Sequence, residues 1–268
     1  MIELNMIESV SENEGCSVTS RIEQVKQPSD GYINPKSMTV KVIGKGIEAL
    51  YPDESISPNL VELAVDHLTR FMLGAYKEHA FSISLMGASE VLENDKAKRR
   101  LAGVKKLDAE SVINAVKLCG FDACYLASPK QYIHVDKIRP DNATIENIII
   151  MVNRSLDFFE SYGPVVLNGF NFEEDGYTDI VSKGDGDFTT KDTLWDLKVS
   201  NNPVTKEQTL QLLMHWRMGL RSIHPEFRYI KYLGIYNPRL NTVSRIAVAD
   251  IPEEVIREVD RDVIGYKE

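Results

Sequence analysis

The feature that most constrains this fold is a pair of short apolar segments that carry charged residues, Gly184–Phe188 and Leu194–Ser200. The polar stretch between them is short enough for a hairpin, so the pattern predicts two neighbouring strands. Since a strand sends alternate side chains to opposite faces, Asp196 and Lys198 project together, away from the apolar side chains between them. Asp187 on the first strand would lie beside Asp196. Two carboxylates and a lysine in one patch suit a hard divalent cation and hydrolytic chemistry.

The composition is that of an ordinary globular protein and disfavours several other classes. The chain has 268 residues, of which 43% are hydrophobic and 26% charged, enough for one large core or two modest domains. No apolar run approaches the roughly 20 residues of a membrane helix, and the N-terminus lacks the pattern of a secretory signal. The three cysteines, Cys16, Cys119 and Cys124, form no CxxC pair, which disfavours a disulfide framework or a structural zinc site. We therefore expect a soluble, cytoplasmic protein with no membrane partner.

The charge of the chain is unevenly distributed. A net charge of -9 disfavours indiscriminate binding to nucleic acid, because phosphate affinity comes largely from lysine and arginine. Residues 217–245, however, contain six basic side chains and the single acid Glu226, and a second basic run lies at 96–106. A solvated surface is the plainer interpretation of the second run.

The distribution of apolar residues divides the chain into three parts. Residues 1–37 are polar, which predicts a loosely ordered arm. Residues 38–140 are predicted to be mainly helical, since apolar side chains recur at three- and four-residue spacing, as at 58–72. A stretch with two prolines, 128–142, is the predicted boundary, and residues 141–268 form the last part.

The last part has a specific order of predicted elements, α-β-β-β-α-β-β-α. Helices are expected at 144–162, at 204–223 and after 251, and strands at 165–172, 177–188, 193–200, 229–236 and 242–248.

These motifs resemble the PD-(D/E)xK nucleases, in particular the exonuclease branch that includes RecB-type nuclease domains and lambda exonuclease. The resemblance covers roughly residues 144–250 and rests on a GxxD element ending at Asp187, the DxK element Asp196–Lys198, and the helix that follows. It implies an α/β, restriction-endonuclease-like core (αβββαβ, a central mixed sheet flanked by helices) beside a helical N-terminal region. It also implies metal-dependent hydrolysis of DNA, by an exonuclease more than by a sequence-specific endonuclease.

The resemblance assigns roles to individual residues. Asp187, Asp196 and the backbone carbonyl of Leu197 would hold Mg²⁺ or Mn²⁺, and Lys198 would assist the attacking water. The family also places an acid or a histidine on the helix before the first strand. Among the acids of the predicted helix, Glu160 lies nearest that strand and is our choice as metal ligand and catalytic residue; the others are Glu146 and Asp157.

The helix after the DxK strand carries a further polar group. At about 100° per residue, Gln208, Gln211 and His215 share one sector. This sector resembles the QxxxY element of the exonuclease branch, with His215 at the tyrosine position, and implies catalytic roles for the glutamines and a DNA contact for the histidine. Arg217 and Arg221 point roughly the other way and would bind a flanking segment of DNA or be solvated.

Partners and alternatives follow from the same residues. The resemblance implies DNA as the substrate, and a homo-oligomer or a protein of DNA recombination or repair as a partner. The alternative is a catalytically lapsed fold that binds nucleic acid or protein. Asn168, where many relatives have a glutamate, and His215 motivate this alternative, as does the acidic net charge. The plainest alternative for the three charged residues is a surface salt bridge across a hairpin.

Overall fold

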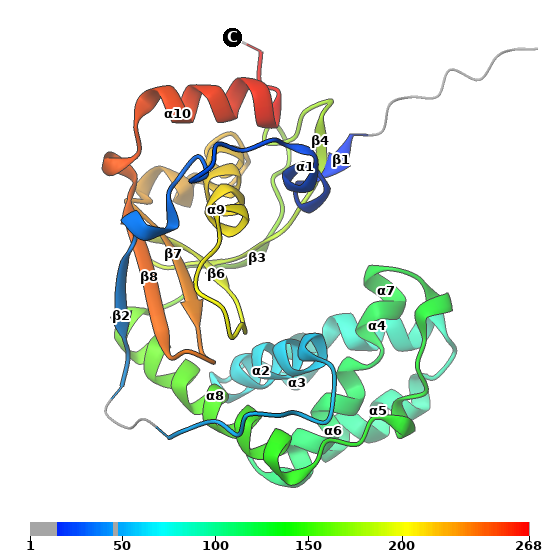
Figure 1. Cartoon of the computed structure of the whole chain (residues 1–268). Coiled ribbons are helices and arrows are strands. Elements are labelled where there is room, and N and C mark those ends of the chain that lie inside the picture. The colour runs from blue at the N-terminus through cyan, green and yellow to red at the C-terminus, as the bar shows by residue number, and fades with distance from the viewer. Residues whose placement is uncertain (1–14, 45–47, 268) are drawn as a thin grey trace, which may run out of the picture.

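The chain folds into a sheet with helices on both faces and a helical lobe at one end of the strands (Figure 1). The structure is a computed structural model that describes residues 15–44 and 48–267. The α/β class with a central mixed sheet flanked by helices is confirmed. No helix among these residues has the length and apolar character needed to cross a membrane.

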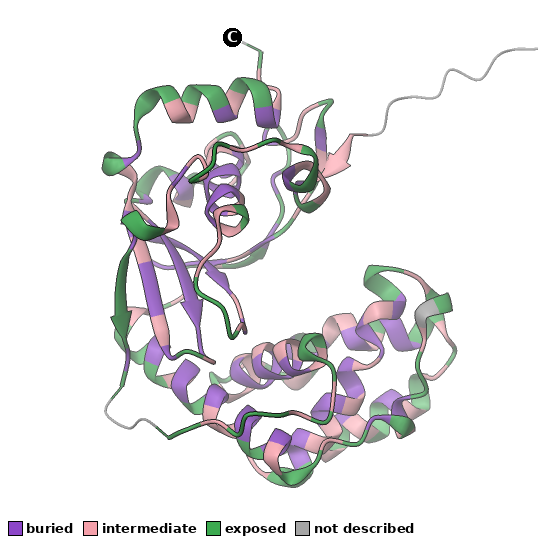
Figure 2. Cartoon of the chain, viewed as in Figure 1, coloured by how far each residue is buried: buried purple, intermediate pink, exposed green. Residues whose placement is uncertain are grey.

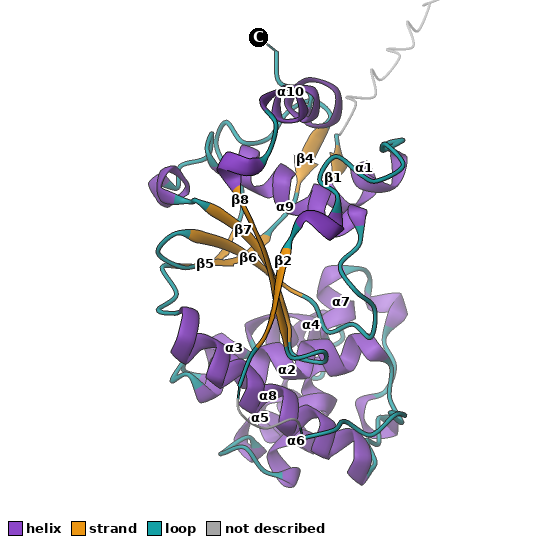
Figure 3. Ribbon diagram, turned by 60° about the vertical axis from the view of Figure 1, so that its left-hand side comes forward, coloured by secondary structure: helices purple, strands orange, loops and turns teal. Residues whose placement is uncertain are grey.

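Six strands form the central sheet in the order β2-β8-β7-β6-β5-β3. The β6–β7 pair is parallel and the other neighbours are antiparallel, so the sheet is mixed. Figure 3 shows its twist, with the helical lobe below the strands. The strands are β2 (Thr39–Val42), β3 (Leu167–Phe170), β5 (Gly186–Thr189), β6 (Thr193–Leu197), β7 (Tyr232–Asn237) and β8 (Thr242–Ala247). A separate parallel pair consists of β1 (Cys16–Ser17) and β4 (Val181–Lys183).

The helices fall into two groups. The helical lobe contains α2 (Pro58–Met72), α3 (Lys77–Ala80), α4 (Ser82–Glu90), α5 (Asn94–Gly103), α6 (Ala109–Cys119) and α7 (Asp122–Leu126), and it packs against α8 (Asn142–Tyr162). The other group contains α1 (Val18–Gln24), α9 (Lys206–Gly219) and α10 (Glu253–Glu258), which continues into a π-helical segment, Val259–Ile264. Short 3₁₀ turns occur at 35–37, 129–131, 135–137, 225–229 and 248–250.

Local sequence signals explain where the functionally important helices begin. Ser57 precedes α2, and its side chain accepts a hydrogen bond from the backbone N–H of Leu60. Asp141 caps α8 in the same way. At α9, Thr205 and Gln208 form a capping box in which each side chain accepts a bond from the backbone N–H of the other. These caps satisfy amide groups that would otherwise lack partners.

The sheet separates two hydrophobic cores, and the alternation of β6 decides which residue enters which core. Trp195, Leu197 and Val199 lie in the core shared with α2 and α8, whereas Leu194 packs toward α9. Phe158 of α8 packs edge-on against Trp195, with ring centres 4.9 Å apart. The predicted alternation along this strand is confirmed. Figure 2 shows the central strands and α9 as buried, while β2 at the sheet edge is exposed.

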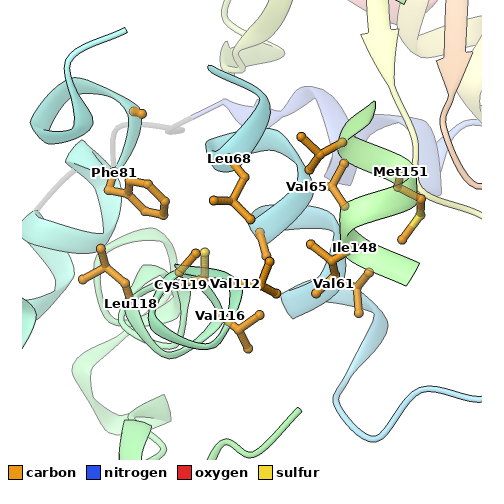
Figure 4. Close-up of a cluster of buried hydrophobic side chains, with 14 of the residues drawn as sticks. Val61, Val65, Leu68, Phe81, Val112, Val116, Leu118, Cys119, Ile148 and Met151 are labelled. Carbon is orange, nitrogen blue, oxygen red and sulfur yellow. The ribbon is translucent and has the colours of Figure 1, made fainter. Parts of the chain in front are cut away.

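The core of the helical lobe continues without a break into the core beneath the sheet. In Figure 4, side chains of α2 such as Val61, Val65 and Leu68 lie between Val112 and other residues of α6 on one side and Met151 and other residues of α8 on the other. Because α8 also covers the sheet, this packing fixes α2 relative to β6.

Residues 15–37 differ from the loosely ordered arm that we predicted. They contain β1 and α1, and Val18, Ile22 and Ile33 are buried against the α9 side of the sheet. The few apolar residues of this segment are spaced to face one core, which average composition does not reveal. The rest of the predicted arm, residues 1–14, lies outside the described residues. Residues 38–140 also supply a strand, β2, to the main sheet.

The predicted strand 177–188 is also divided in the structure. Its residues form β4 and β5, which belong to different sheets, with Gly184 and Asp185 between them. Tyr177 donates a hydrogen bond to the Gly184 carbonyl, so the chain turns where one continuous strand was expected.

A buried polar network lies inside the helical lobe and ends at α2. His67 is buried, and its ring nitrogens lie 3.2 Å from Asp66 Oδ2 and 2.9 Å from Asp122 Oδ2. Ser84 donates a hydrogen bond to Asp122, and Arg70 donates one to Asp66. Burial alone lowers the pKa of His67, but hydrogen bonds and negative charges from Asp122 and Asp66 outweigh it and raise the pKa to about 9. At neutral pH His67 is therefore a buried cation that joins α2 to α7.

This pKa predicts how stability depends on pH. Because the folded-state pKa of His67 lies above its unfolded value, its contribution is complete below about pH 6.5 and is lost as the pH rises through 9. We expect His67 to contribute up to about 3 kcal/mol to the free energy of unfolding at pH 6. Urea denaturation at pH 6, 7.5 and 9 should show this loss in the wild type and in the exposed control His79→Gln, but not in His67→Gln. If wild type and His67→Gln differed by the same free energy of unfolding at all three pH values, the predicted role of His67 would be wrong.

Candidate metal and phosphodiester site

Asp187 of β5 and Asp196 of β6 lie side by side at the ends of two paired strands. Phe188 pairs with Trp195, so the next positions of the two strands are the aspartates. Asp187 Oδ2 accepts a hydrogen bond of 2.7 Å from the backbone N–H of Leu197. The carboxylate thus replaces a strand carbonyl, and the ladder ends there. The N–H and the carbonyl of one strand residue point to the same side, so the Leu197 carbonyl is directed toward the β5 side as well.

Lys198 completes the predicted group. Its Nζ lies 3.0 Å from Asp196 Oδ2, and its backbone N–H donates to the carbonyl of Tyr236 on β7. Burial alone lowers the pKa of Lys198, but the negative charges of Asp196 and Asp187 outweigh it and raise the pKa. Lys198 is therefore an ammonium at neutral pH. The side chain of Asp196 is only 3% exposed, which excludes the surface salt bridge across a hairpin.

The surroundings of Asp196 disfavour the ionised form of its carboxyl group. Burial is the main cause that raises its pKa to about 7, and the negative charges of Asp187 and Glu62 add to it against the effect of Lys198. Burial likewise raises the pKa of Asp187. Asp196 Oδ2 is buried, and its close partner among the described residues is the Lys198 ammonium at 3.0 Å. A buried carboxylate oxygen that faces a single cationic group keeps lone pairs that can bind a cation.

Glu62 of α2 is the third carboxylate of the site, and the sequence analysis did not find it. Its Oε1 lies 3.4 Å from the backbone nitrogen of Val199. Burial raises the pKa of Glu62, Lys198 opposes this effect, and Asp187 adds to it. The helical lobe therefore contributes directly to the site. The available signal was a pair of acids, Glu62 and Asp66, four residues apart on an amphipathic helix.

Asp66 and Arg70 form the outer part of this face of α2. Arg70 lies 2.9 Å from Asp66 Oδ2, and the two affect the pKa of Asp187 in opposite directions. Asp66 and Arg70 line a small cavity of about 210 Å³ together with the buried Leu197 and the exposed Asn168. Asp66 is already paired with Arg70 and His67, so it does not add unbalanced charge to the site.

Glu160, which we assigned to the metal, is placed differently. It lies on the exposed face of α8, and no described contact joins it to the aspartates. The apolar face of α8 is turned toward the sheet through residues such as Phe158, which leaves Glu160 pointing outward. Glu62 occupies the place that we gave to Glu160. The other acids considered on α8, Glu146 and Asp157, are exposed as well.

The polar sector of α9 faces the site, but its residues differ in what they can do. Gln208 belongs to the capping box and lines the same cavity as Lys198. Gln211, one turn further, is half-buried. His215 is buried against Phe172, and burial first, then the charge of Lys198, lowers its pKa to about 3. His215 is thus a neutral core residue, and its predicted DNA contact is wrong.

Arg217 of α9 and Arg221, which follows the end of that helix, have structural partners. Arg217 forms an ion pair of 2.7 Å with Asp260, and the guanidinium of Arg221 lies 3.6 Å from the centre of the Tyr266 ring. These contacts fasten α9 to the C-terminal segment on the side away from Lys198. The predicted DNA contact of Arg217 conflicts with this pairing, because Asp260 already balances its charge. Arg221 is exposed.

A second cluster with potential metal ligands lies in the helical lobe. One ligand atom from each of His67, Cys119 and Asp122 falls within 4.8 Å of the others. Both nitrogens of His67 already face carboxylates, and burial raises the pKa of the Cys119 thiol well above its usual value. A metal ion would have to displace the protons of His67 and Cys119 and break the ion pairs of His67, so the plainer interpretation of this cluster is an ion pair beside a buried cysteine.

Comparisons with models of protein families, with curated proteins and with solved structures find no match. Functional inference therefore depends on the motifs and on the geometry of the site.

The position of Glu62 predicts how metal affinity responds to mutation. Glu62→Gln removes one charged ligand and should weaken Mn²⁺ binding at least tenfold, a loss of about 1.4 kcal/mol or more. Glu160→Gln makes the same chemical change on an exposed face and should bind Mn²⁺ as the wild type does. Electron paramagnetic resonance titration of free Mn²⁺ measures both. If Glu160→Gln weakened binding and Glu62→Gln did not, the assignment of the third ligand would be reversed.

Proposed function

We propose that this protein is a Mg²⁺- or Mn²⁺-dependent nuclease that hydrolyses DNA phosphodiester bonds. The observation that carries the proposal is that Asp187, Asp196 and Lys198 lie together at the ends of β5 and β6 with Glu62 of α2 beside them. One oxygen from each of the three acids does not fall within 4.8 Å of the others, so a bound cation would draw them closer. Burial is the first cause of the raised pKa of each of the three acids, and a smaller part comes from the negative charge of neighbouring acids. The ammonium of Lys198 offsets only part of the negative charge that the three carboxylates carry when they are ionised. A bound divalent cation would balance the rest.

The ligand types favour a hard cation. Mg²⁺ and Mn²⁺ prefer oxygen ligands, and Mg²⁺ retains several water molecules when only a few carboxylates hold it. Glu62, Asp187 and Asp196 would supply the carboxylates, and the Leu197 carbonyl lies on the same side of β6. When bound, the cation would lower the pKa of a water molecule and offset charge on the phosphate.

Lys198 has a separate task in this proposal. It is a permanent ammonium beside Asp196, and 27% of its side chain is exposed. It can therefore reach a phosphate oxygen from the open side while Asp196 holds it in place. A fixed positive charge at that position stabilises negative charge that develops on the phosphate, and it orients the attacking water. A high pKa makes Lys198 unsuitable as a general base.

The choice of DNA, and of an exonuclease, comes from the motifs. The GxxD and DxK elements and the polar sector of α9 resemble the exonuclease branch of the PD-(D/E)xK nucleases. Gln208 and Lys198 line one cavity, so in this proposal part of that sector lies near the bound substrate. A cytoplasmic location, and a homo-oligomer or a recombination or repair protein as partner, belong to the same proposal.

One activity assay separates the enzyme from a non-catalytic binding module. The purified chain is incubated with linear and circular DNA, single- and double-stranded, in Mg²⁺ or Mn²⁺. We expect cleavage of linear DNA in preference to closed circles. Lys198→Ala should reduce the rate by about 10²–10³-fold, because it removes a preorganised charge at the phosphate. Lys191→Ala, an exposed lysine in the β5–β6 turn, should leave the rate unchanged.

Two results would contradict the proposed nuclease activity. One is the absence of cleavage on every substrate with either metal, and the other is equal cleavage by Lys198→Ala and the wild type. DNA binding without cleavage would favour the lapsed, binding-only alternative.

A further inference from the structure

A cavity of about 690 Å³ opens on the α9 side of the sheet, directly beside Lys198. Its floor consists of side chains from β7 and β8, such as Ile235 and Ser244, and one wall is the segment from Ser200 to Gln208. The opposite wall is made by residues 29–36 and by Val40 of β2. Residues 29–36 and β2 precede residues 144–250, the part of the chain that resembles the PD-(D/E)xK nucleases. We call this cavity the β2 groove.

The lining of the β2 groove combines small polar groups with apolar carbon and contains no aromatic ring. Hydroxyl and amide side chains such as Ser200, Asn202 and Thr242 alternate with apolar ones such as Ile235. Lys36 and Lys206 lie at the rim together with the acids Asp30 and Glu207. The hydroxyl, amide and ammonium groups of this lining can hydrogen-bond a sugar-phosphate chain without reading a sequence.

We propose that the β2 groove binds a short stretch of single-stranded nucleic acid that continues from the phosphate at Lys198. This inference rests on the proposed function, since it extends the same site to its substrate. Lys198 belongs both to the ion pair with Asp196 and to the lining of the groove, whereas Glu62, Asp187 and Asp196 do not line it. The groove therefore offers a path for the part of a strand that extends beyond a phosphate at Lys198.

The size of the groove selects the form of the substrate. A volume of 690 Å³ is that of a small-ligand site. A double helix, whose major groove alone is about 12 Å wide, does not fit such a space. A single strand does, so a duplex substrate would have to be separated at its end before one strand reached Lys198.

The chain offers two matched pairs of variants on its exposed edge. Val40 lines the groove, whereas Val42, on the same face of β2, does not; they are 60% and 67% exposed, so tryptophan is tolerated at either position. Lys36 lines the groove and Lys41 does not, and both are exposed. Val40→Trp narrows the groove and Lys36→Glu reverses a charge at its rim, while Val42→Trp and Lys41→Glu make the same changes outside it.

Binding of a fluorescein-labelled oligothymidylate is measured by fluorescence anisotropy in Ca²⁺, which separates binding from cleavage. Val40→Trp and Lys36→Glu should each weaken binding about tenfold, and the two controls should bind as the wild type does. Blunt duplex DNA of the same length should bind more weakly than the single strand. Equal affinity for all four variants, or tighter binding of the duplex, would overturn the proposal.

A parallel assay keeps this test distinct from that of the nuclease. Hydrolysis of the p-nitrophenyl ester of thymidine 5′-monophosphate reports on the metal site alone. Val40→Trp and Lys36→Glu should retain this hydrolysis while their KM for the oligonucleotide rises about tenfold. If the wild type hydrolyses neither the ester nor any DNA substrate, the proposed enzyme fails, while the anisotropy result still decides whether the groove binds a strand.

Discussion

The burial of three carboxylates around one ammonium is the constraint on which the rest of this structure depends. Asp196 is almost fully buried, and this burial is the main cause that raises its pKa to about 7, with a smaller contribution from the negative charges of Asp187 and Glu62. Such a patch is costly unless a positive charge balances it. Lys198 balances part of it and lies within the same patch. The remaining excess is what makes a divalent cation the expected occupant.

The helical lobe is part of this arrangement, because it brings Glu62 to the end of β6. Its core is continuous with the core under the sheet, so the position of α2 follows from packing against α6 and α8. His67 is bonded both to Asp66 and to Asp122, which fixes the polar face of α2 as well as its apolar face. Electrostatics at the strand ends and packing in the lobe therefore have to be satisfied together.

Short-range sequence patterns predicted the site residues that lie on β5 and β6. They did not predict the residue that the helical lobe contributes. The alternation around Asp196 and the nearby position of Asp187 follow from the period of a strand and from one turn. Glu62 was missed because it lies 137 residues from Val199 in the sequence, and the direction of its helix face depends on tertiary packing. Glu160 and His215 were misplaced for the same reason, since helical spacing shows which residues share a face but not where that face points.

The most direct measurement is the position of a metal ion in a crystal of the protein soaked in Mn²⁺, located by anomalous diffraction. We expect one strong peak with carboxylate oxygens of Asp187, Asp196 and Glu62 at ligand distance, about 2.1 Å for a cation of this kind. Lys198 should stay near Asp196 without binding the metal. No peak between these carboxylates at millimolar Mn²⁺, or a peak whose ligands exclude both aspartates, would contradict the proposed metal site.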